Sequence, residues 1–242
     1  MFLRTLIVAS GLLVSVQAEE GVVLLHGLAR TKRSMEPLEA AFRKAGYEVV
    51  NLDYPSRRMP VADLADKTIG ATLADPRLRG CGKVHFVTHS LGGLLVRSYF
   101  AQHKDARLGR VVMLGPPNQG SEVVDRLKSW GLFRFITGPA GSQLGTRPDD
   151  SLPQSFGSPS FELGVIAGDR SINWINSAMI PGPDDGKVSV ARTKVAGMKD
   201  HLVVHATHPF LMRNRSVIAA TLRFVRDGRF APAREGQRST GP

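Results

Sequence analysis

A serine between an apolar run and a helical pattern is the clearest candidate for covalent chemistry in this sequence. Residues 84–88 are apolar and rich in β-branched side chains, and leucines recur at helical spacing after Ser90. A serine at such a strand-to-helix turn occupies the place of a nucleophile elbow, whose usual string is G-x-S-x-G. We therefore predict Ser90 as a nucleophile, with the N-cap serine of an ordinary turn as the alternative.

The residues beside Ser90 are consistent with this turn. The string reads Thr-His-Ser-Leu-Gly over residues 88–92, so that Thr88 replaces the first glycine of the motif. Gly92 supplies a small residue where the strand and the helix must approach each other. The same turn directs the backbone N–H of Leu91 toward the place where an acyl oxyanion would form, and we predict Leu91 as an oxyanion donor.

A serine hydroxyl needs a base within hydrogen-bond reach, and that base needs an orienting acid. The chain has seven histidines. We expect His26 to form structural hydrogen bonds and His89 to point away from Ser90. We expect solvated side chains for the three histidines at element ends, namely His85, His103 and His201.

His205 and His208 remain as candidates for the base. His205 belongs to a predicted strand over residues 201–206. His208 follows that strand and precedes Pro209, whose fixed φ suits the first turn of a helix. That position lies at the carboxyl edge of a parallel sheet, where Ser90 also emerges. We predict His208 as the base and keep His205 as the alternative.

Strand-like and helix-like segments alternate along the chain, which predicts an α/β fold with a doubly wound, mostly parallel sheet of about six strands. The predicted strands are residues 21–28, 48–54, 84–88, 110–115, 161–167 and 201–206. The predicted helices are residues 35–45, 61–73, 91–103 and 210–225. Together they form one predicted domain over residues 19–230.

The alternation fails between residues 118 and 160, where an apolar cluster that includes Trp130 precedes a Gly/Pro/Ser-rich section. Long irregular insertions in a domain with otherwise short loops are often functional. We predict a small cap or lid over the site. The alternative is a helix that packs on the sheet and is followed by a loop.

The N-terminus has the pattern of a secretory signal. A charged start at Arg4 precedes an apolar run over residues 5–16, and an A-x-A-like site ends at Ala18. The run is short for a transmembrane helix, so residues 1–18 predict export to the periplasm or the medium, with an uncleaved anchor as the alternative. The polar residues 231–242 are predicted to be disordered.

The formal net charge is +11, and removal of the signal subtracts only Arg4. This charge favours attraction to an anionic membrane surface, although scattered basic residues also fit a solvated positive surface. No helix-turn-helix, zinc-finger or aromatic RNA-binding pattern is present, so we expect no nucleic-acid partner. No metal-binding string is present, and we expect neither a metal nor a cofactor.

These motifs together resemble the α/β-hydrolase superfamily, and within it the small bacterial lipases and esterases. The matching segments follow the family's order over nearly the whole mature chain: His26-Gly27-Leu28 and residues 88–93, 115–121, 184–188 and 208. The resemblance implies a serine–acid–histidine order with Ser90 first and His208 last. It also implies that the N–H of Leu28 is the second oxyanion donor.

The resemblance ranks three aspartates as the acid. Asp185 opens a D-G-x-V string like that of similar lipases, Asp169 lies where members with short loops place their acid, and Asp184 comes third. Turn chemistry alone is the alternative explanation of the Asp-Asp-Gly string.

The implied function is an exported serine hydrolase that cleaves an acyl lipid or a short acyl ester through an acyl-enzyme intermediate. A thioesterase, amidase or acyltransferase could use the same triad, because fold does not fix the reaction. A catalytically silent hydrolase fold that binds a lipid or a partner protein is the alternative from another class.

Overall fold

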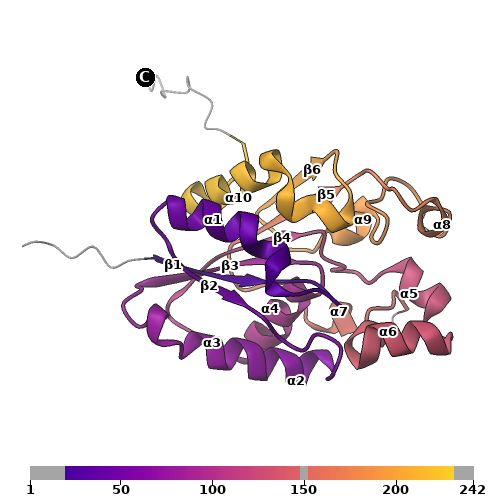
Figure 1. The fold of residues 1–242 in the computed structure, drawn as a ribbon, viewed down its shortest axis with the longest axis horizontal. Helices are drawn as coiled ribbons and strands as arrows, with labels where there is room; N and C mark the ends of the chain where they lie inside the picture. Colours follow the sequence, from indigo (N-terminus) through magenta and orange to yellow (C-terminus); the bar gives the residue numbers. More distant parts are fainter. Residues whose placement is uncertain (1–19, 148–151, 232–242) are drawn as a thin grey trace, which may run out of the picture.

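One six-stranded sheet, in which every strand pair is parallel, forms the centre of the computed structural model, which describes residues 20–147 and 152–231 (Figure 1). The strands are β1 (Glu20–Leu25), β2 (Glu48–Leu52), β3 (Lys83–His89), β4 (Leu108–Leu114), β5 (Leu163–Gly168) and β6 (Asp200–Val204). Their order across the sheet is β2-β1-β3-β4-β5-β6. This confirms the predicted parallel, doubly wound α/β fold.

Helices cover both faces of the sheet (Figure 1). One face carries α1 (Glu36–Lys44) and α10 (Arg215–Asp227). The other face carries α2 (Val61–Ala65), the π-helical turn η2 (Asp66–Gly70), α3 (Ala71–Leu73) and α4 (Leu91–Gln102). Because η2 joins α2 to α3 without a break, the helix predicted over residues 61–73 forms as one helical segment.

Further helices lie in the connections: η1 (Lys32–Met35), η3 (Pro76–Leu78), α5 (Glu122–Leu127), α6 (Gly131–Ser142), α7 (Leu152–Ser155), α8 (Trp174–Ser177), α9 (Val190–Thr193) and η4 (His208–Arg213). In Figure 1, α5, α6 and α8 lie at the end of the molecule toward which the strands run. The insertion predicted over residues 118–160 holds α5, α6 and α7.

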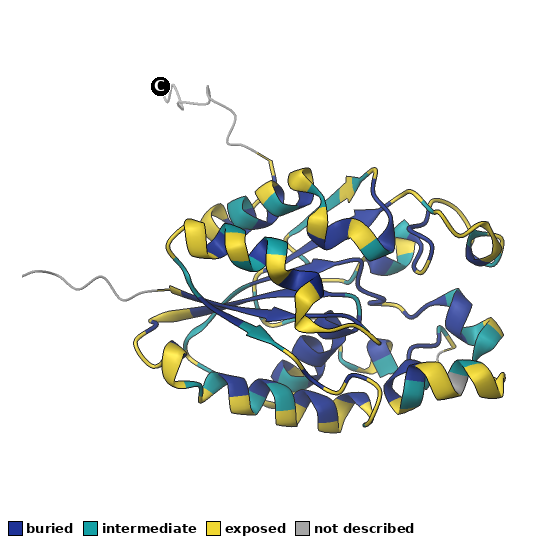
Figure 2. Cartoon of the chain, viewed as in Figure 1, coloured by how far each residue is buried: buried dark blue, intermediate teal, exposed yellow. Residues whose placement is uncertain are grey.

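The core has two layers because successive residues of a strand face opposite sides of the sheet. Val22 and Leu24 of β1 pack with the buried side chains of α1 and α10. Val23 and Leu25 pack with those of α2 and α4. All four are completely buried, as the dark strands of Figure 2 show. Each such side chain contributes about 1.5–3 kcal/mol by burial, so the sheet holds the residues at its strand ends on a rigid base.

Several element boundaries differ from the sequence-based predictions. The last strand ends at Val204 rather than at residue 206, so His205 follows the strand in which it was predicted to lie. Two other differences have a clear cause. The first strand ends at Leu25 rather than Leu28, because residues 27–30 form a tight turn in which the Arg30 amide donates to the Gly27 carbonyl at 3.2 Å. The helix predicted over residues 210–225 is divided into η4 and α10. The division occurs because the Asn214 side chain caps α10 by accepting hydrogen bonds from the first backbone amides of that helix.

Some predictions fall on residues that the structure does not describe. The signal predicted over residues 1–18 lies wholly outside the described part, as does the predicted disordered tail apart from Ala231. Within residues 20–147 and 152–231, no helix is both long and apolar enough to cross a membrane.

Candidate active site

Ser90 lies at the corner between β3 and α4, as predicted. Its backbone has φ 51° and ψ −118°, and Ala29 is the other non-glycine residue with positive φ in the described part. Such a conformation costs on the order of 1–3 kcal/mol and persists only where the surrounding structure enforces it. Here the Ser90 amide donates to the Leu114 carbonyl of the neighbouring strand at 2.9 Å, which fixes the turn against the sheet.

Two glycines allow the helix to pack closely on the strands at this corner. A Cβ atom on Gly92 would lie 2.8 Å from the Leu25 carbonyl oxygen, which is too close for any larger residue. A Cβ atom on Gly93 would lie 3.2 Å from Oγ1 of Thr88. The space that Thr88 needs in place of the usual glycine is therefore provided by Gly93.

Asp185 and His208 form a buried pair, with 2.7 Å between Oδ2 of the carboxylate and Nδ1 of the imidazole. Only 1% of Asp185 and 7% of His208 is exposed. The other carboxylate oxygen, Oδ1, accepts hydrogen bonds from the amides of Lys187 at 3.0 Å and Val188 at 2.9 Å. Because both oxygens have partners, the carboxylate holds one orientation, and Nε2 is the ring nitrogen that remains to act as a base.

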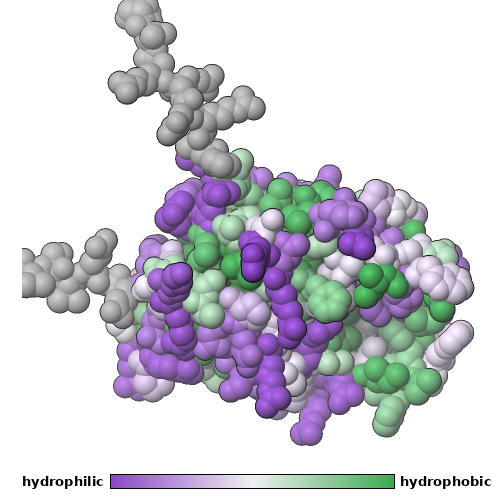
Figure 3. Space-filling view, turned by 45° about the horizontal axis from the view of Figure 1, so that its top comes forward, coloured by the Kyte–Doolittle hydropathy of each residue, from purple (hydrophilic) through white to green (hydrophobic). Residues whose placement is uncertain are grey.

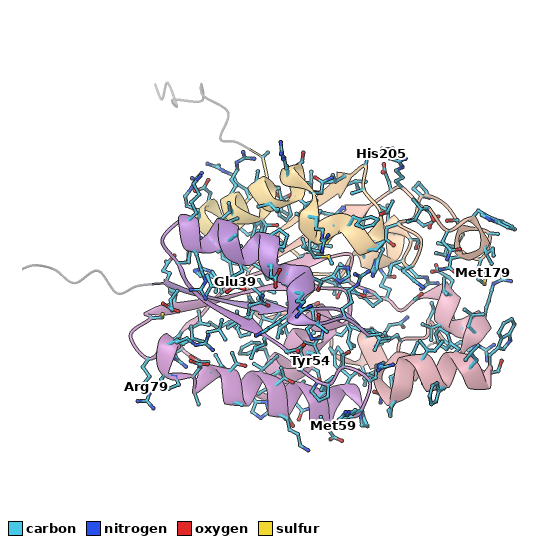
Figure 4. The ribbon with its side chains drawn as sticks, in the orientation of Figure 1. Glu39, Tyr54, Met59, Arg79, Met179 and His205 are labelled. Carbon is cyan, nitrogen blue, oxygen red and sulfur yellow. The ribbon has the colours of Figure 1, made fainter. Side chains whose placement is uncertain are left out.

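The lower-ranked candidates lie elsewhere. Asp169 and His205 pair with each other, with 2.9 Å between Oδ1 and Nδ1. The His205 side chain is 74% exposed and points to solvent at the molecular surface (Figure 4). Asp184 stabilises a turn, since its Oδ1 accepts from the Gly186 amide at 2.7 Å and from the Ser177 hydroxyl at 2.9 Å. The structure thus brings Asp185, not Asp169 or Asp184, together with His208.

Ser90 and His208 line one pocket of about 240 Å³, which Leu28 also lines. The remaining wall is largely apolar and comes from the insertion: Val123, Val124, Phe133, Ile136 and Leu144. The predicted insertion therefore contributes directly to the site, while its action as a lid stays a prediction. An acyl chain could contact this apolar wall while its carbonyl carbon lies near Ser90.

The charged side chains that line the pocket are cationic. Arg30 and Lys187 line it together with the candidate catalytic pair, and no Asp or Glu of the described residues does. Nor do residues 20–147 and 152–231 contain a cluster of three or more His, Cys, Asp or Glu side chains that could hold a metal ion. The chemistry available here is that of hydroxyls, imidazoles and two cations.

The two predicted oxyanion donors lie at the expected kinds of turn. Leu91 is the first residue of α4, where a backbone N–H has no partner within the helix. Leu28 lies in the tight turn after β1, which is held because the Ala29 amide donates to the Ser56 hydroxyl at 3.0 Å. The Tyr54 hydroxyl also donates to the His26 carbonyl. Joint action of the Leu28 and Leu91 amides on an oxyanion stays a prediction.

His89 supports His208, a contact that the sequence did not predict. Its Nε2 atom lies 3.1 Å from the His208 carbonyl oxygen, and the two ring centroids are 4.7 Å apart. Burial, reinforced by the neighbouring His208, holds the pKa of His89 well below its usual value. A neutral His89 with its proton on Nε2 can donate to that carbonyl and so hold the backbone of His208 in place.

The other four histidines agree only in part with the exposure predicted for them. His26 is buried and structural as expected, since its ring stacks on Tyr54 with centroids 4.1 Å apart. His103 is exposed as expected. His85 is not solvated but buried, because Gly109 leaves room for its ring and the Arg110 amide donates to its Nδ1 atom at 2.9 Å. His201 is half-buried, with Nε2 3.0 Å from the Thr193 hydroxyl.

Arg97 of α4 is a second feature that the sequence did not predict. It is 4% exposed, and burial lowers its pKa to about 10. Its Nη1 atom donates to the Asn118 carbonyl at 3.0 Å, and Nη2 donates to the Gly157 carbonyl at 2.9 Å. One guanidinium thereby joins the beginning and the end of the insertion to the helix that follows Ser90. The sequence feature that could have revealed this role is an arginine within the otherwise apolar run of that helix.

Comparison with known proteins agrees with this architecture. Among solved structures, the mature lipase BlEst2 of Bacillus licheniformis has a TM-score of 0.65 at 20% identity, over 86% of this chain and 90% of that chain. The metagenomic carboxyl esterase MGS0156 has a TM-score of 0.63 at 20% identity, over 81% and 66%. A bromoperoxidase from Bacillus anthracis has a TM-score of 0.62 at 17% identity, over 86% and 92%. At these identities the likeness concerns the fold.

Sequence comparison is more specific about the family. A comparison with curated proteins gave no match. The model of the alpha/beta hydrolase family, however, matches residues 22–186, which include most of β1, the Ser90 corner and Asp185. That range is more than half of the 242 residues. The chain therefore belongs to the alpha/beta hydrolase family.

Proposed function

We propose that the protein is an exported serine hydrolase that cleaves carboxylic esters through an acyl-enzyme intermediate. The observation that carries this proposal is the shared pocket of Ser90 and His208, together with the bond from His208 to Asp185. A serine, a histidine and an acid so arranged are the parts of a nucleophilic triad. The family membership and the strained conformation of Ser90 support the same reading.

Acylation uses each of these groups. His208 Nε2 accepts the hydroxyl proton of Ser90 as Oγ forms a bond to the acyl carbonyl carbon. The amides of Leu28 and Leu91 donate to the resulting oxyanion, each contributing about 2.7–4 kcal/mol by analogy with a measured oxyanion donor. Asp185 stabilises the imidazolium through Nδ1. The alcohol then leaves with the proton from His208, and the acyl group remains on Ser90.

Deacylation repeats these steps with water. His208 Nε2 removes a proton from a water molecule as its oxygen attacks the acyl-enzyme carbonyl carbon. The second tetrahedral intermediate collapses when the bond to Ser90 Oγ breaks and His208 returns the proton to that oxygen. The products are a carboxylic acid and the free enzyme. The ester and water supply all the atoms of the reaction, so it requires no cofactor.

The proposed substrate is an acyl lipid or a short acyl ester at a lipid surface. Apolar side chains of α6 and of the residue just before it are exposed beside the pocket, including Trp130, Leu132 and Phe135. Apolar side chains gather at this end of the molecule in Figure 3. The net charge of +11 and the signal-like residues 1–18 support an exported protein that approaches an anionic membrane surface.

A fluorophosphonate probe tests the proposal. We expect it to label Ser90, and we expect Ser90→Ala to lose labelling and to lower kcat for p-nitrophenyl esters by about 10⁴–10⁶-fold. Ser216→Ala, at an exposed serine of α10, is the matched control and should react like the wild type. A thioester and an amide with the same acyl chain show which leaving group the enzyme prefers. Absence of labelling in the folded wild type would favour a non-catalytic lipid- or protein-binding hydrolase fold.

A further inference from the structure

Two cations reach the pocket of Ser90 from different loops. Arg30 lies in the turn after β1, and Lys187 follows Asp185 and Gly186 in the loop before α9. Neither side chain forms a hydrogen bond or an ion pair with another described residue. Both residues remain exposed, so a ligand in the pocket can reach their charged groups.

Several arginines of the protein are paired with carboxylates, whereas Arg30 and Lys187 line the pocket of Ser90 without such a partner among the described residues. Arg107 donates to Asp105, with 2.8 Å between Nη2 and Oδ2. Arg192 donates to Glu122, with 2.6 Å between Nε and Oε1. Such pairs satisfy the guanidinium within the protein itself. Arg30 and Lys187 have no equivalent, and the pocket that they line contains no carboxylate from the described residues.

The surroundings of both cations disfavour an uncompensated positive charge. Partial burial of its charged group lowers the pKa of Arg30, and repulsion from Arg213 lowers it further. Partial burial also lowers the pKa of Lys187, while attraction to Asp185 opposes the change. The Asp185 carboxylate is already bonded to His208 and to two backbone amides, so it stabilises the lysine only through space. An anionic ligand would supply the missing counter-charge.

We propose that the preferred ester carries an anionic group, a phosphate or a carboxylate, within a few atoms of the scissile bond, and that Arg30 and Lys187 bind this group. The inference rests on the proposed ester hydrolysis and names its substrate class. The apolar wall of α5 and α6 receives the acyl chain, while the cations bind the charged end of the same molecule. A guanidinium matches the planar oxygens of either anion, and an ammonium adds a second, adaptable donor.

A matched pair of esters tests the inference. The first is 4-nitro-3-(butanoyloxy)benzoate, and the second is its methyl ester, which has the same acyl chain without the charge. We expect the wild type to have the higher kcat/KM for the anion. Arg30→Gln and Lys187→Gln should each lower the anion-to-neutral ratio of kcat/KM by about three- to tenfold. Most of the change should be in KM of the anionic ester, because the contact exists before the chemical step.

Control variants remove a cation far from the pocket. Arg79→Gln and Lys44→Gln change exposed residues, and Figure 4 shows Arg79 at the opposite end of the molecule from α8. Both should keep the wild-type ratio. Raising the salt concentration to about 0.5 M should lower the wild-type ratio and have less effect on the Arg30→Gln Lys187→Gln double variant, because salt screens partly exposed charges.

A second pair identifies the anion. Dihexanoylphosphatidic acid and dihexanoylglycerol, both below the concentrations at which they aggregate, differ by one phosphate group, whereas the first pair differs by a carboxylate. A ratio that depends on Arg30 and Lys187 in either pair supports the inference and shows which anion is recognised. Ratios unchanged by both substitutions in both pairs would overturn it while ester hydrolysis stands. If the wild type hydrolyses a p-nitrophenyl ester but none of these four esters, the inference is overturned and the proposed function stands. If it hydrolyses no ester at all, the proposed function is wrong and the inference falls with it.

Discussion

His208 and Asp185 are joined twice. The carboxylate Oδ2 lies 2.7 Å from Nδ1 of the ring, and the His208 amide donates to the Asp185 carbonyl at 2.9 Å. The backbone bond fixes the position of the His208 main chain, and the side-chain bond fixes the orientation of its ring. Asp169 and His205, by contrast, share one exposed side-chain contact. The double connection is what a catalytic pair needs, because the base must hold one tautomer and one orientation.

Replacement of the acid should remove most of the activity. Asp185→Asn keeps the shape of the side chain but no longer stabilises the required tautomer and imidazolium, and we expect kcat for a p-nitrophenyl ester to fall about 10⁴-fold. Asp169→Asn, which alters the exposed pair, should keep nearly all activity. Steady-state kinetics on both purified variants make the comparison. A severe loss in Asp169→Asn with a benign Asp185→Asn would reverse the choice of acid.

Replacement of the base should prevent acylation. In His208→Ala, no group accepts the Ser90 proton, so fluorophosphonate labelling of Ser90 should slow by several orders of magnitude. His205→Ala removes a solvated ring and should label at the wild-type rate. Time-resolved labelling followed by peptide mass spectrometry measures both rates. Fast labelling in His208→Ala, with none in a folded His205→Ala, would show that His205 rather than His208 is the base.

The apolar surface formed by Trp130 and α6 should matter most at a lipid interface. Trp130 is 63% exposed, so it is not a core residue, and Trp130→Ala removes apolar area without leaving a cavity. We expect a larger loss on emulsified long-chain esters than on a dissolved short-chain ester, since only the former offers an apolar surface. Val203→Ala removes an exposed apolar side chain from β6 and serves as the control. Equal losses on both substrates would argue against an interfacial role.

Stability should fall as the solution becomes acidic. Burial lowers the pKa of His89 in the folded protein, so below the ordinary value of 6.5 the unfolded chain binds a proton that the folded chain does not. This part of the stability is complete above pH 6.5 and decreases by about 1.4 kcal/mol per unit below it, until the folded pKa is reached.

The matching experiment is urea denaturation of His89→Gln at pH 7.5, 6 and 5. The glutamine retains a donor for the His208 carbonyl but has no titrating ring, so the dependence of unfolding free energy on pH should become shallower. His103→Gln, at an exposed histidine, should keep the wild-type slope. An unchanged slope in His89→Gln would show that other groups dominate the acid sensitivity.

The strands were predictable because their signal is local. Each buried strand is a short apolar run, and the β1 and β3 runs are bounded by polar or small residues that end them. The boundaries that differed depend on side-chain contacts instead. The capping bonds of Asn214 divide the last predicted helix into two. The sequence alone does not predict whether an asparagine at such a position caps a helix or continues one.

The candidate site was predictable in part for a similar reason. Ser90 and His208 follow from their places at strand ends, because parallel strands bring their carboxyl ends together. The resemblance ranked Asp185 above Asp169, but only the structure shows that Asp185 is the one bonded to His208. The unpartnered state of Arg30 and Lys187 also needed the structure, because a sequence does not show whether a carboxylate lies beside a cation.

Arg97 has a consequence for how this family member could diversify. Because one guanidinium bonds to both Asn118 and Gly157, the two ends of the insertion are held at a fixed separation. The chain between them can then lengthen, shorten or change sequence without moving Ser90 or the sheet, since extra loop length has a small entropic cost. The insertion is in effect an exchangeable cassette, and grafting a relative's segment between these two anchor points is a direct route to altered acyl-chain preference.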